Sequence, residues 1–164
     1  DGNPLSRNSA EIKTVENKIV VVNSLLVDQI YHDPEAIYKL SPSKFEELVA
    51  ELLKREGYSV EVTKMTRDGG KDILVAQHST IGNFLFYVEC KRYSPHNHVG
   101  IQLVKNLYAT VSADRATAGL LVTTSYFTKP AQSFVEHLQH QINLTDYLEL
   151  KEWINKAYRK RYGA

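Results

Sequence analysis

Residues 72–91, with the sequence DILVAQHSTIGNFLFYVECK, contain two apolar runs separated by a short polar turn. Both runs are rich in β-branched and aromatic residues, which favour strands, and a turn of this length joins antiparallel strands. If residues 79–82 form the loop, residue 78 pairs with residue 83. Counting back along the two strands then brings Asp72 opposite Glu89, so the stretch predicts a hairpin with two facing carboxylates.

The charged side chains of this hairpin gather on one face. Strand residues two apart share a face, so Glu89 and Lys91 point together and Cys90 points the other way, into the core. Carboxylates with Cβ atoms ~5 Å apart repel one another and favour a hard divalent ion such as Mg²⁺. Lys91 could then orient a water or stabilise phosphate charge. The alternative is an ion-pair ladder on a solvated face, although Glu89 stands among very apolar residues.

The segments around the hairpin predict an α/β fold. Apolar spacing predicts a helix over 43–56, and alternation predicts a strand over 58–63. The elements expected after the hairpin are a helix over 99–113, a buried strand over 118–124, a helix from Thr128 to about His140, a strand over 142–144 and a final helix. This order, α-β-β-β-α-β-α-β followed by a helix, indicates a central mixed sheet flanked by helices.

The two ends of the chain differ from the middle, and we divide the sequence into residues 1–40, 41–155 and 156–164. The first part combines a polar leader with a predicted helical arm over 12–30, although the IVVV run at 19–22 also suits a strand. The arm could pack on the domain or on another chain. The last part is basic and carries two tyrosines, and we expect a tail.

The composition excludes several classes of protein. The chain has 164 residues, a formal net charge of +1 and 43% apolar residues, which excludes wholly disordered and strongly acidic proteins. One cysteine excludes an internal disulfide framework and a cysteine-rich zinc site. We expect a cytoplasmic protein, because no secretory signal and no membrane-spanning apolar run is visible. A local basic groove remains compatible with this balanced charge.

Four segments in a fixed order give the chain a resemblance to a known family. The resemblance covers about residues 41–152 and closely follows the Mrr-type restriction endonuclease domain of the PD-(D/E)xK nuclease superfamily. The segments are FEELVAELLKREGYSVEVT (45–63), DGGKDILV (68–75), YVECKRY (87–93) and GLLVTTSYFT (119–128). The resemblance implies a restriction-endonuclease-like α/β sandwich and hydrolysis of DNA phosphodiester bonds with Mg²⁺, for which Mn²⁺ can substitute.

The resemblance also implies roles for individual residues. Asp72 and Glu89 match the family's metal ligands, and Lys91 matches the lysine that activates or positions the attacking water. Glu46, after the helical phenylalanine, matches an acid that can complete the metal site, and the adjacent Glu47 stays an alternative. One or two metal ions are compatible with this set. The chain has Lys71 and Asp72 where the superfamily often has a Pro-Asp pair, a departure usual for the Mrr-like branch.

Further residues are weaker candidates for contacts with DNA. They carry basic groups, amides or hydroxyls close to the predicted site, although each also suits a purely structural role. The candidates are Arg67, Lys71, Gln102, Lys105, Thr124 and Ser125.

The context that we expect is restriction of foreign DNA. The expected partners are DNA, a second copy of the chain and a specificity or regulatory domain outside this sequence. The alternatives are a structure-specific nuclease that resembles Holliday-junction resolvases and a non-catalytic nucleic-acid-binding module on the same fold.

Overall fold

The computed structural model describes residues 23–63, 71–138 and 140–163, and within them a single mixed sheet forms the centre of the molecule. The five strands lie side by side in chain order, from β1 to β5. Their bounds are β1 (Ser59–Val62), β2 (Ile73–Ser79), β3 (Gly82–Lys91), β4 (Ala118–Thr123) and β5 (Ile142–Thr145). The expected α/β fold with a mixed sheet is confirmed.

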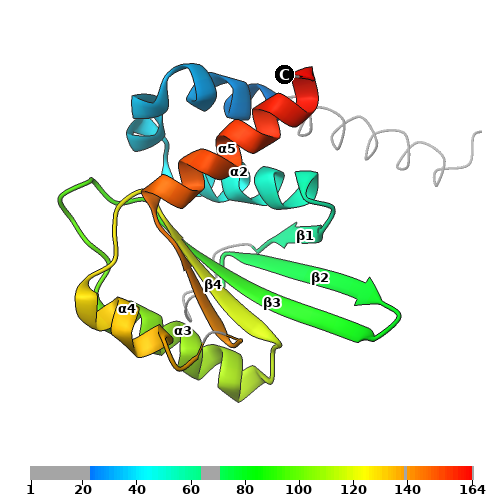
Figure 1. Cartoon of the computed structure of the whole chain (residues 1–164), viewed down its shortest axis with the longest axis vertical. Coiled ribbons are helices and arrows are strands. Elements are labelled where there is room, and N and C mark those ends of the chain that lie inside the picture. The colour runs from blue at the N-terminus through cyan, green and yellow to red at the C-terminus, as the bar shows by residue number, and fades with distance from the viewer. Residues whose placement is uncertain (1–22, 64–70, 139, 164) are drawn as a thin grey trace, which may run out of the picture.

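The hairpin of β2 and β3 has the register that its sequence predicts. His78 pairs with Asn83, and the antiparallel pairing extends to Ile73 opposite Val88. Ser79 also pairs with Gly82, so the loop comprises two residues instead of four. Figure 1 shows this hairpin projecting from the body of the molecule.

The other half of the sheet is parallel and brings the end of β3 into the interior. Glu89 pairs with Leu121 and Lys91 with Thr123, and β4 pairs in parallel with β5. Parallel strands need crossover connections, and helices supply them here. The carboxyl ends of β3 and β4 therefore meet at one edge, beside the helices that connect them.

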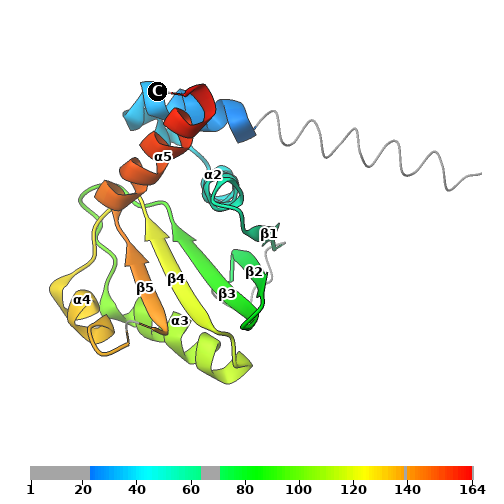
Figure 2. The same cartoon turned by 45° about the vertical axis from the view of Figure 1, so that its right-hand side comes forward.

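Helices cover both faces of the sheet. On one face lie α2 (Pro42–Arg55) and α5 (Tyr147–Tyr162), and on the other lie α3 (Ile101–Asp114) and α4 (Lys129–Val135), as Figures 1 and 2 show. Ser41 caps α2 by accepting the Lys44 N–H, and Asp146 with Glu149 forms a capping box on α5. The helix α4 ends five residues earlier than predicted, because the chain turns at Glu136 and runs back toward β5.

Two hydrophobic clusters fill the two layers. Phe45, Val88 and Leu150 belong to the cluster under α2 and α5, whereas Tyr87 and Leu121 belong to the cluster under α3 and α4. Successive residues of β3 thus enter opposite clusters, as strand geometry requires. Glu89 and Lys91 share the parity of Tyr87 and point toward α3.

The segments at both ends of the described chain belong to the same folded unit. Residues 23–32 are helical, and Val27 and Ile30 are buried in the cluster under α5. The rest of the predicted arm lies outside the described residues. Residues 156–162, which we expected to be a tail, form the last turns of α5, and Ala157 packs into the core. A short 3-10 helix, η1 (Pro34–Lys39), connects the first helix to α2. In the part of the chain that the structure describes, no helix is long and apolar enough to cross a membrane.

Candidate active site

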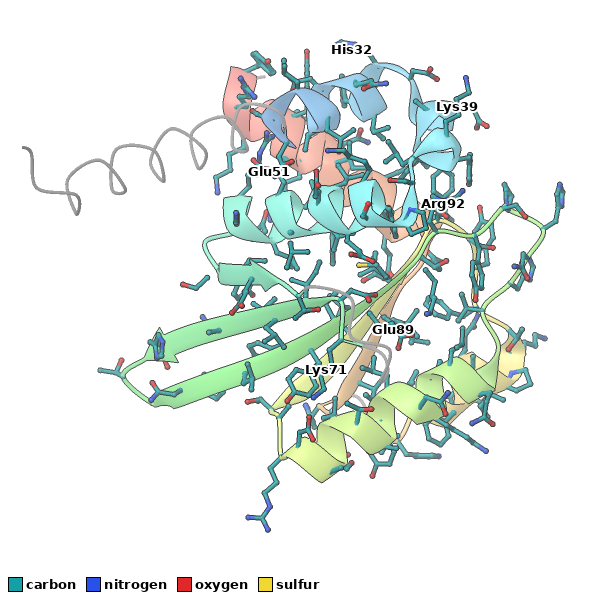
Figure 3. All side chains as sticks on the ribbon, turned by 180° about the vertical axis from the view of Figure 1, so that it is seen from behind. His32, Lys39, Glu51, Lys71, Glu89 and Arg92 are labelled. Carbon is teal, nitrogen blue, oxygen red and sulfur yellow. The ribbon has the colours of Figure 1, made fainter. Side chains whose placement is uncertain are left out.

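Glu89 and Lys91 form an ion pair where β3 enters the interior. The Lys91 Nζ lies 2.8 Å from the Glu89 Oε1, and the residue Glu89 is only 4% exposed. Figure 3 shows Glu89 on the side of the sheet that faces α3. Burying a charge is costly unless it is paired and hydrogen-bonded. Lys91 pairs with only one of the two carboxylate oxygens, so this arrangement calls for a functional explanation or further ligands.

Asp72 reaches the same place from the start of β2. It lies one residue before the strand, and its N–H donates to the Val88 carbonyl at 2.9 Å. Its Oδ2 accepts the N–H of Cys90 at 2.7 Å. The carboxylate therefore lies against the β3 segment that carries Glu89 and Lys91. The strand pairing ends at Ile73 and Val88, so Asp72 is not paired directly with Glu89 as counting from the turn predicts.

Burial and the neighbouring charges shift the pKa values of Glu89 and Lys91. Burial raises the pKa of Glu89 and the charge of Asp72 raises it further, while Lys91 lowers it without cancelling the shift. Burial is the largest single effect and lowers the pKa of Lys91, but the hydrogen bond to Glu89 and the negative charges of Glu89 and Asp72 together outweigh it and leave the pKa above its usual value. Lys91 is therefore a firmly protonated ammonium beside two carboxyl groups.

Glu46 from α2 is the third carboxyl group of the site. Burial raises its pKa, and among its neighbours Asp72 raises it and Lys91 lowers it. Glu47 points elsewhere, since its Oε2 binds the Lys44 Nζ at 2.8 Å in an exposed ion pair. The charges of Asp72 and Lys91 thus act on Glu46, whereas Glu47 is paired with Lys44, and this favours Glu46 as the third acid of the site.

The donor set fits a divalent ion that carries water. The Glu89 Oε2 is buried and has no hydrogen-bond partner among the residues described, so one oxygen lacks a ligand. Within the described ranges, no group of three or more His, Cys, Asp and Glu side chains converges closely enough to enclose an ion. Mg²⁺ needs no such cage, because it typically binds one or two carboxylates and keeps waters or substrate phosphates as its other ligands.

Cys90 lies on the far side of the strand, as its position predicts. It is buried in the cluster under α2, and burial raises the pKa of its thiol well above the usual value. A thiol of this kind is inert as a nucleophile.

The basic and amide candidates for DNA contacts have other partners in the structure. Lys71 binds the Asp114 carboxylate and lies 4.5 Å above the centre of the Tyr87 ring. Gln102 donates to Asn106 at 2.9 Å, and Lys105 lies over the Phe134 ring. The side chains of Gln102 and Lys105 are exposed on α3, so both stay candidates, whereas Arg67 lies outside the described residues.

Thr124 and Ser125 do not fit a direct role in DNA binding. Both are fully buried. The Thr124 hydroxyl donates to the Tyr93 carbonyl at 2.6 Å, and the Ser125 hydroxyl donates to the Pro95 carbonyl at 3.4 Å. The two hydroxyls hold the loop after β3 against the end of β4, which is the structural role that the sequence also allowed.

Sequence reasoning missed Asp114, whose carboxylate binds the side chain of Lys71, the residue next to Asp72. The Asp114 carboxylate at the end of α3 binds Lys71 and also accepts the Tyr87 hydroxyl at 3.0 Å. No local pattern links positions 71 and 114. The only available signal is that Tyr87 lies on the Glu89 face of its strand.

Searches among known proteins place these features in context. The family model described as "Restriction endonuclease" (Mrr_cat) matches residues 37–154. The type IV methyl-directed restriction enzyme EcoKMrr of Escherichia coli K12 is 30% identical over 113 residues, which cover 66% of this chain and 36% of that protein. An uncharacterized protein of Sinorhizobium fredii, y4cE, is 28% identical over 97% of this chain and 42% of its own length. The chain therefore spans less than half of these relatives.

Two solved structures share the fold. The DNA modification-dependent restriction endonuclease AspBHI matches with a TM-score of 0.61 and 24% identity, over 82% of this chain and 35% of its own. The MspJI restriction endonuclease, solved in complex with a 27-mer oligonucleotide, matches with a TM-score of 0.60 and 18% identity, over 86% of this chain and 33% of its own. At these identities the likeness concerns the fold alone.

Proposed function

Because the chain belongs to the Mrr-type restriction endonuclease family, we propose that it is a Mg²⁺-dependent DNA endonuclease that hydrolyses phosphodiester bonds. The observation that carries this proposal is the buried Glu89, whose Oε1 pairs with the Lys91 ammonium while its Oε2 has no hydrogen-bond partner among the residues described. A buried carboxylate with an unsatisfied oxygen is costly unless it binds something. A hard cation that also binds a DNA phosphate would satisfy it.

We assign metal binding and stabilisation of the reacting phosphate to four side chains. Asp72 and Glu89 would hold the ion, with Glu46 able to bind it directly or through a water. When bound, Mg²⁺ lowers the pKa of a water and offsets phosphate charge. Lys91 stays protonated beside Glu89, so its ammonium can hold the attacking water or the phosphate oxygen and oppose the charge that develops during attack.

The biological context that we propose is restriction of foreign DNA in the cytoplasm. The methyl-directed restriction enzyme EcoKMrr, which is 30% identical over 66% of this chain, supports this context. Because the chain spans only part of those relatives, we propose that target selection depends on a further domain or partner. A homodimer, in which each copy cuts one strand, also remains part of the proposal.

The experiment that tests this function is cleavage of methylated and unmethylated supercoiled plasmid with Mg²⁺ or EDTA. Wild-type protein should nick or linearise the plasmid with Mg²⁺ only. Asp72→Ala and Lys91→Ala should each lower the rate at least ~100-fold, because each removes a group that acts on the reacting phosphate. Lys54→Ala, at an exposed position near the end of α2, is the matched control and should retain most of the activity.

The results separate the candidate functions. Metal-independent DNA binding without cleavage, by wild type and both site variants alike, would reject the nuclease and favour a binding module. Cleavage that survives in both variants would place the chemistry elsewhere.

A further inference from the structure

A groove of about 580 Å³ lies on the face of the sheet opposite Glu89. Its floor contains Val75, Phe86 and Leu120, which belong to or pack against the cluster under α2 and α5. The end of α2 forms one wall, and α5 forms another with Trp153. The groove therefore lies on the opposite face of the sheet from Glu89 and Lys91, and its α2 wall is the end of that helix far from Glu46.

The groove exists because the two helices on this face cover only part of the sheet. Figures 1 and 2 show α2 and α5 crossing near one end of the strands, while β2 and β3 extend beyond them. Beyond Phe86 the ring of Phe84 continues the apolar surface, with the two ring centres 6.4 Å apart. Parallel strands are normally covered by helices on both faces. The groove beside α5 therefore leaves apolar side chains of β2, β3 and β4 open to an occupant.

The rim of the groove carries an excess of negative charge. Glu56, Glu149 and Glu152 line it, and Lys156 is the one basic residue among the lining side chains. Lys156 is already paired with Glu56, at 2.9 Å between the Lys156 Nζ and the Glu56 Oε2. Three glutamates against one lysine leave two negative charges in excess, on the α5 side of an apolar floor.

This charge distribution excludes two of the possible occupants. DNA carries a phosphate at every nucleotide and is repelled by a surface with excess glutamates. A second copy of this chain that docks groove to groove would bring the acidic rims together, because a two-fold contact repeats the same patch on both sides. A basic apolar occupant meets neither objection.

We propose that this groove binds an amphipathic helix of a partner polypeptide. The apolar stripe of the helix covers Val75, Phe86 and Leu120, and its lysine or arginine side chains pair with Glu149 and Glu152. Helices that lie in apolar grooves are a recurrent mode of peptide recognition, anchored by residues at i, i+3, i+4 and i+7. The proposal does not depend on the nuclease activity, because it concerns the opposite face of the sheet.

Trp153 allows a direct test, because it is the only tryptophan of the chain and lies in the wall of the groove. The probe is a synthetic peptide of about 14 residues in which leucines form one helical stripe and lysines flank it. Its control replaces every lysine by glutamate. We expect a saturable change in Trp153 fluorescence with the basic peptide and none with the acidic one.

Variants locate the binding. Glu149→Gln with Glu152→Gln should weaken the basic peptide about tenfold, because two exposed ion pairs are lost while the amide that replaces the Glu149 carboxylate can still serve the capping box. Asn143→Arg, at an exposed position lining the groove, should weaken it at least as much. The matched control is Glu136→Gln, an exposed residue at the end of α4 on the other face, which should bind as wild type does.

Several results would overturn this proposal. They are equal binding of the acidic and basic peptides, and unchanged binding in the Glu149 and Glu152 double variant. Self-association in the analytical ultracentrifuge that Asn143→Arg abolishes would assign the groove to a second copy and reject a partner helix. Circular dichroism melting curves of each variant confirm that a loss of binding is not a loss of folding.

Discussion

At the scale of single residues, the candidate site is a compromise between folding and chemistry. Glu89 costs stability because its Oε2 is buried without a hydrogen-bond partner among the residues described, and Lys91 offsets part of that cost through the other oxygen. Functional residues commonly break a rule that the rest of a protein obeys. The same environment determines how the site should respond to pH.

Binding of Mg²⁺ should release protons in the acidic range. Burial raises the pKa of Glu89 and of Glu46 above 4.5, so part of each carboxyl is still protonated where an ordinary glutamate is ionised. The ion binds carboxylate, so its affinity should rise with pH through the range in which these carboxyls ionise and then level off. Calorimetry in buffers of different ionisation enthalpy measures the protons released. An affinity independent of pH would contradict the assignment of Glu89 as ligand.

The stability of the metal-free protein should change in the opposite direction. A carboxyl whose pKa is raised by folding contributes most when it is protonated, and this contribution is lost as pH rises through the folded-state pKa. Glu89→Gln, which remains uncharged at every pH, should therefore flatten the fall in stability of the metal-free protein between pH 4.5 and neutrality. Urea unfolding at several pH values measures this difference. An identical pH dependence in wild type and variant would reject the burial argument.

The two adjacent glutamates of α2 provide an internal control. Glu46→Gln should weaken Mg²⁺ activation of cleavage roughly tenfold, because Glu46 is partly buried and the charges of Asp72 and Lys91 act on its carboxyl. Glu47→Gln should have little effect, because Glu47 is held in an exposed pair with Lys44. Cleavage rates as a function of Mg²⁺ concentration distinguish the two. A larger effect of Glu47→Gln would reverse the assignment.

At the scale of elements, the sequence predicted what local patterns encode. The alternation and the short turn of residues 72–91 specify the hairpin register, because a one-residue slip would turn Glu89 and Lys91 to the wrong face. The pairing of Lys71 with Asp114 and the burial of Thr124 were not predictable, because they depend on where α3 and the loop after β3 settle. From the sequence, the hydroxyls of Thr124 and Ser125 are candidate phosphate ligands at the surface. In the structure they are buried and donate hydrogen bonds to main-chain carbonyls.

The contact between α3 and β4 depends on a glycine that no motif singled out. A Cβ added to Gly119 would lie 2.9 Å from the Val111 Cγ2 and 3.0 Å from both Leu107 Cγ and Ile142 Cδ1. Gly119→Ala should therefore lower the free energy of unfolding by ~1–3 kcal/mol through overpacking. Chemical denaturation measures it.

Gly100 provides the control for that substitution. A Cβ there meets no atom within 4 Å, and the backbone has ordinary negative φ at the start of α3. Gly100→Ala should cost only a few tenths of a kcal/mol, from weaker capping. If Gly119→Ala and Gly100→Ala lowered the free energy of unfolding equally, the close contact of Gly119 with Leu107 and Val111 of α3 would be contradicted.

At the scale of the whole molecule, the folded unit extends beyond the residues that the family model matches. The first described helix and the last turns of α5 lie outside residues 37–154 and pack on each other. The rings of Tyr31 and Tyr158 stack with centres 3.7 Å apart and planes within 5°. Arg55 of α2 links the two ends, since it donates to the Ser24 hydroxyl at 3.1 Å and to the Ala157 carbonyl at 3.2 Å.

This packing makes the ends of the described chain interdependent. Tyr31→Ala and Tyr158→Ala should each destabilise the protein, and the double variant should lose less than the sum by about 0.5–1.5 kcal/mol, the usual coupling of an aromatic pair. A cycle built on Tyr31 and Tyr93, which lies in the other cluster, should give no coupling. Urea denaturation of the wild type and these variants provides the numbers. A strictly additive Tyr31–Tyr158 cycle would mean that the first helix is an arm free of the domain. In that case deletion of residues 1–30 would leave the melting temperature unchanged, whereas the packing described here predicts that the deletion lowers it.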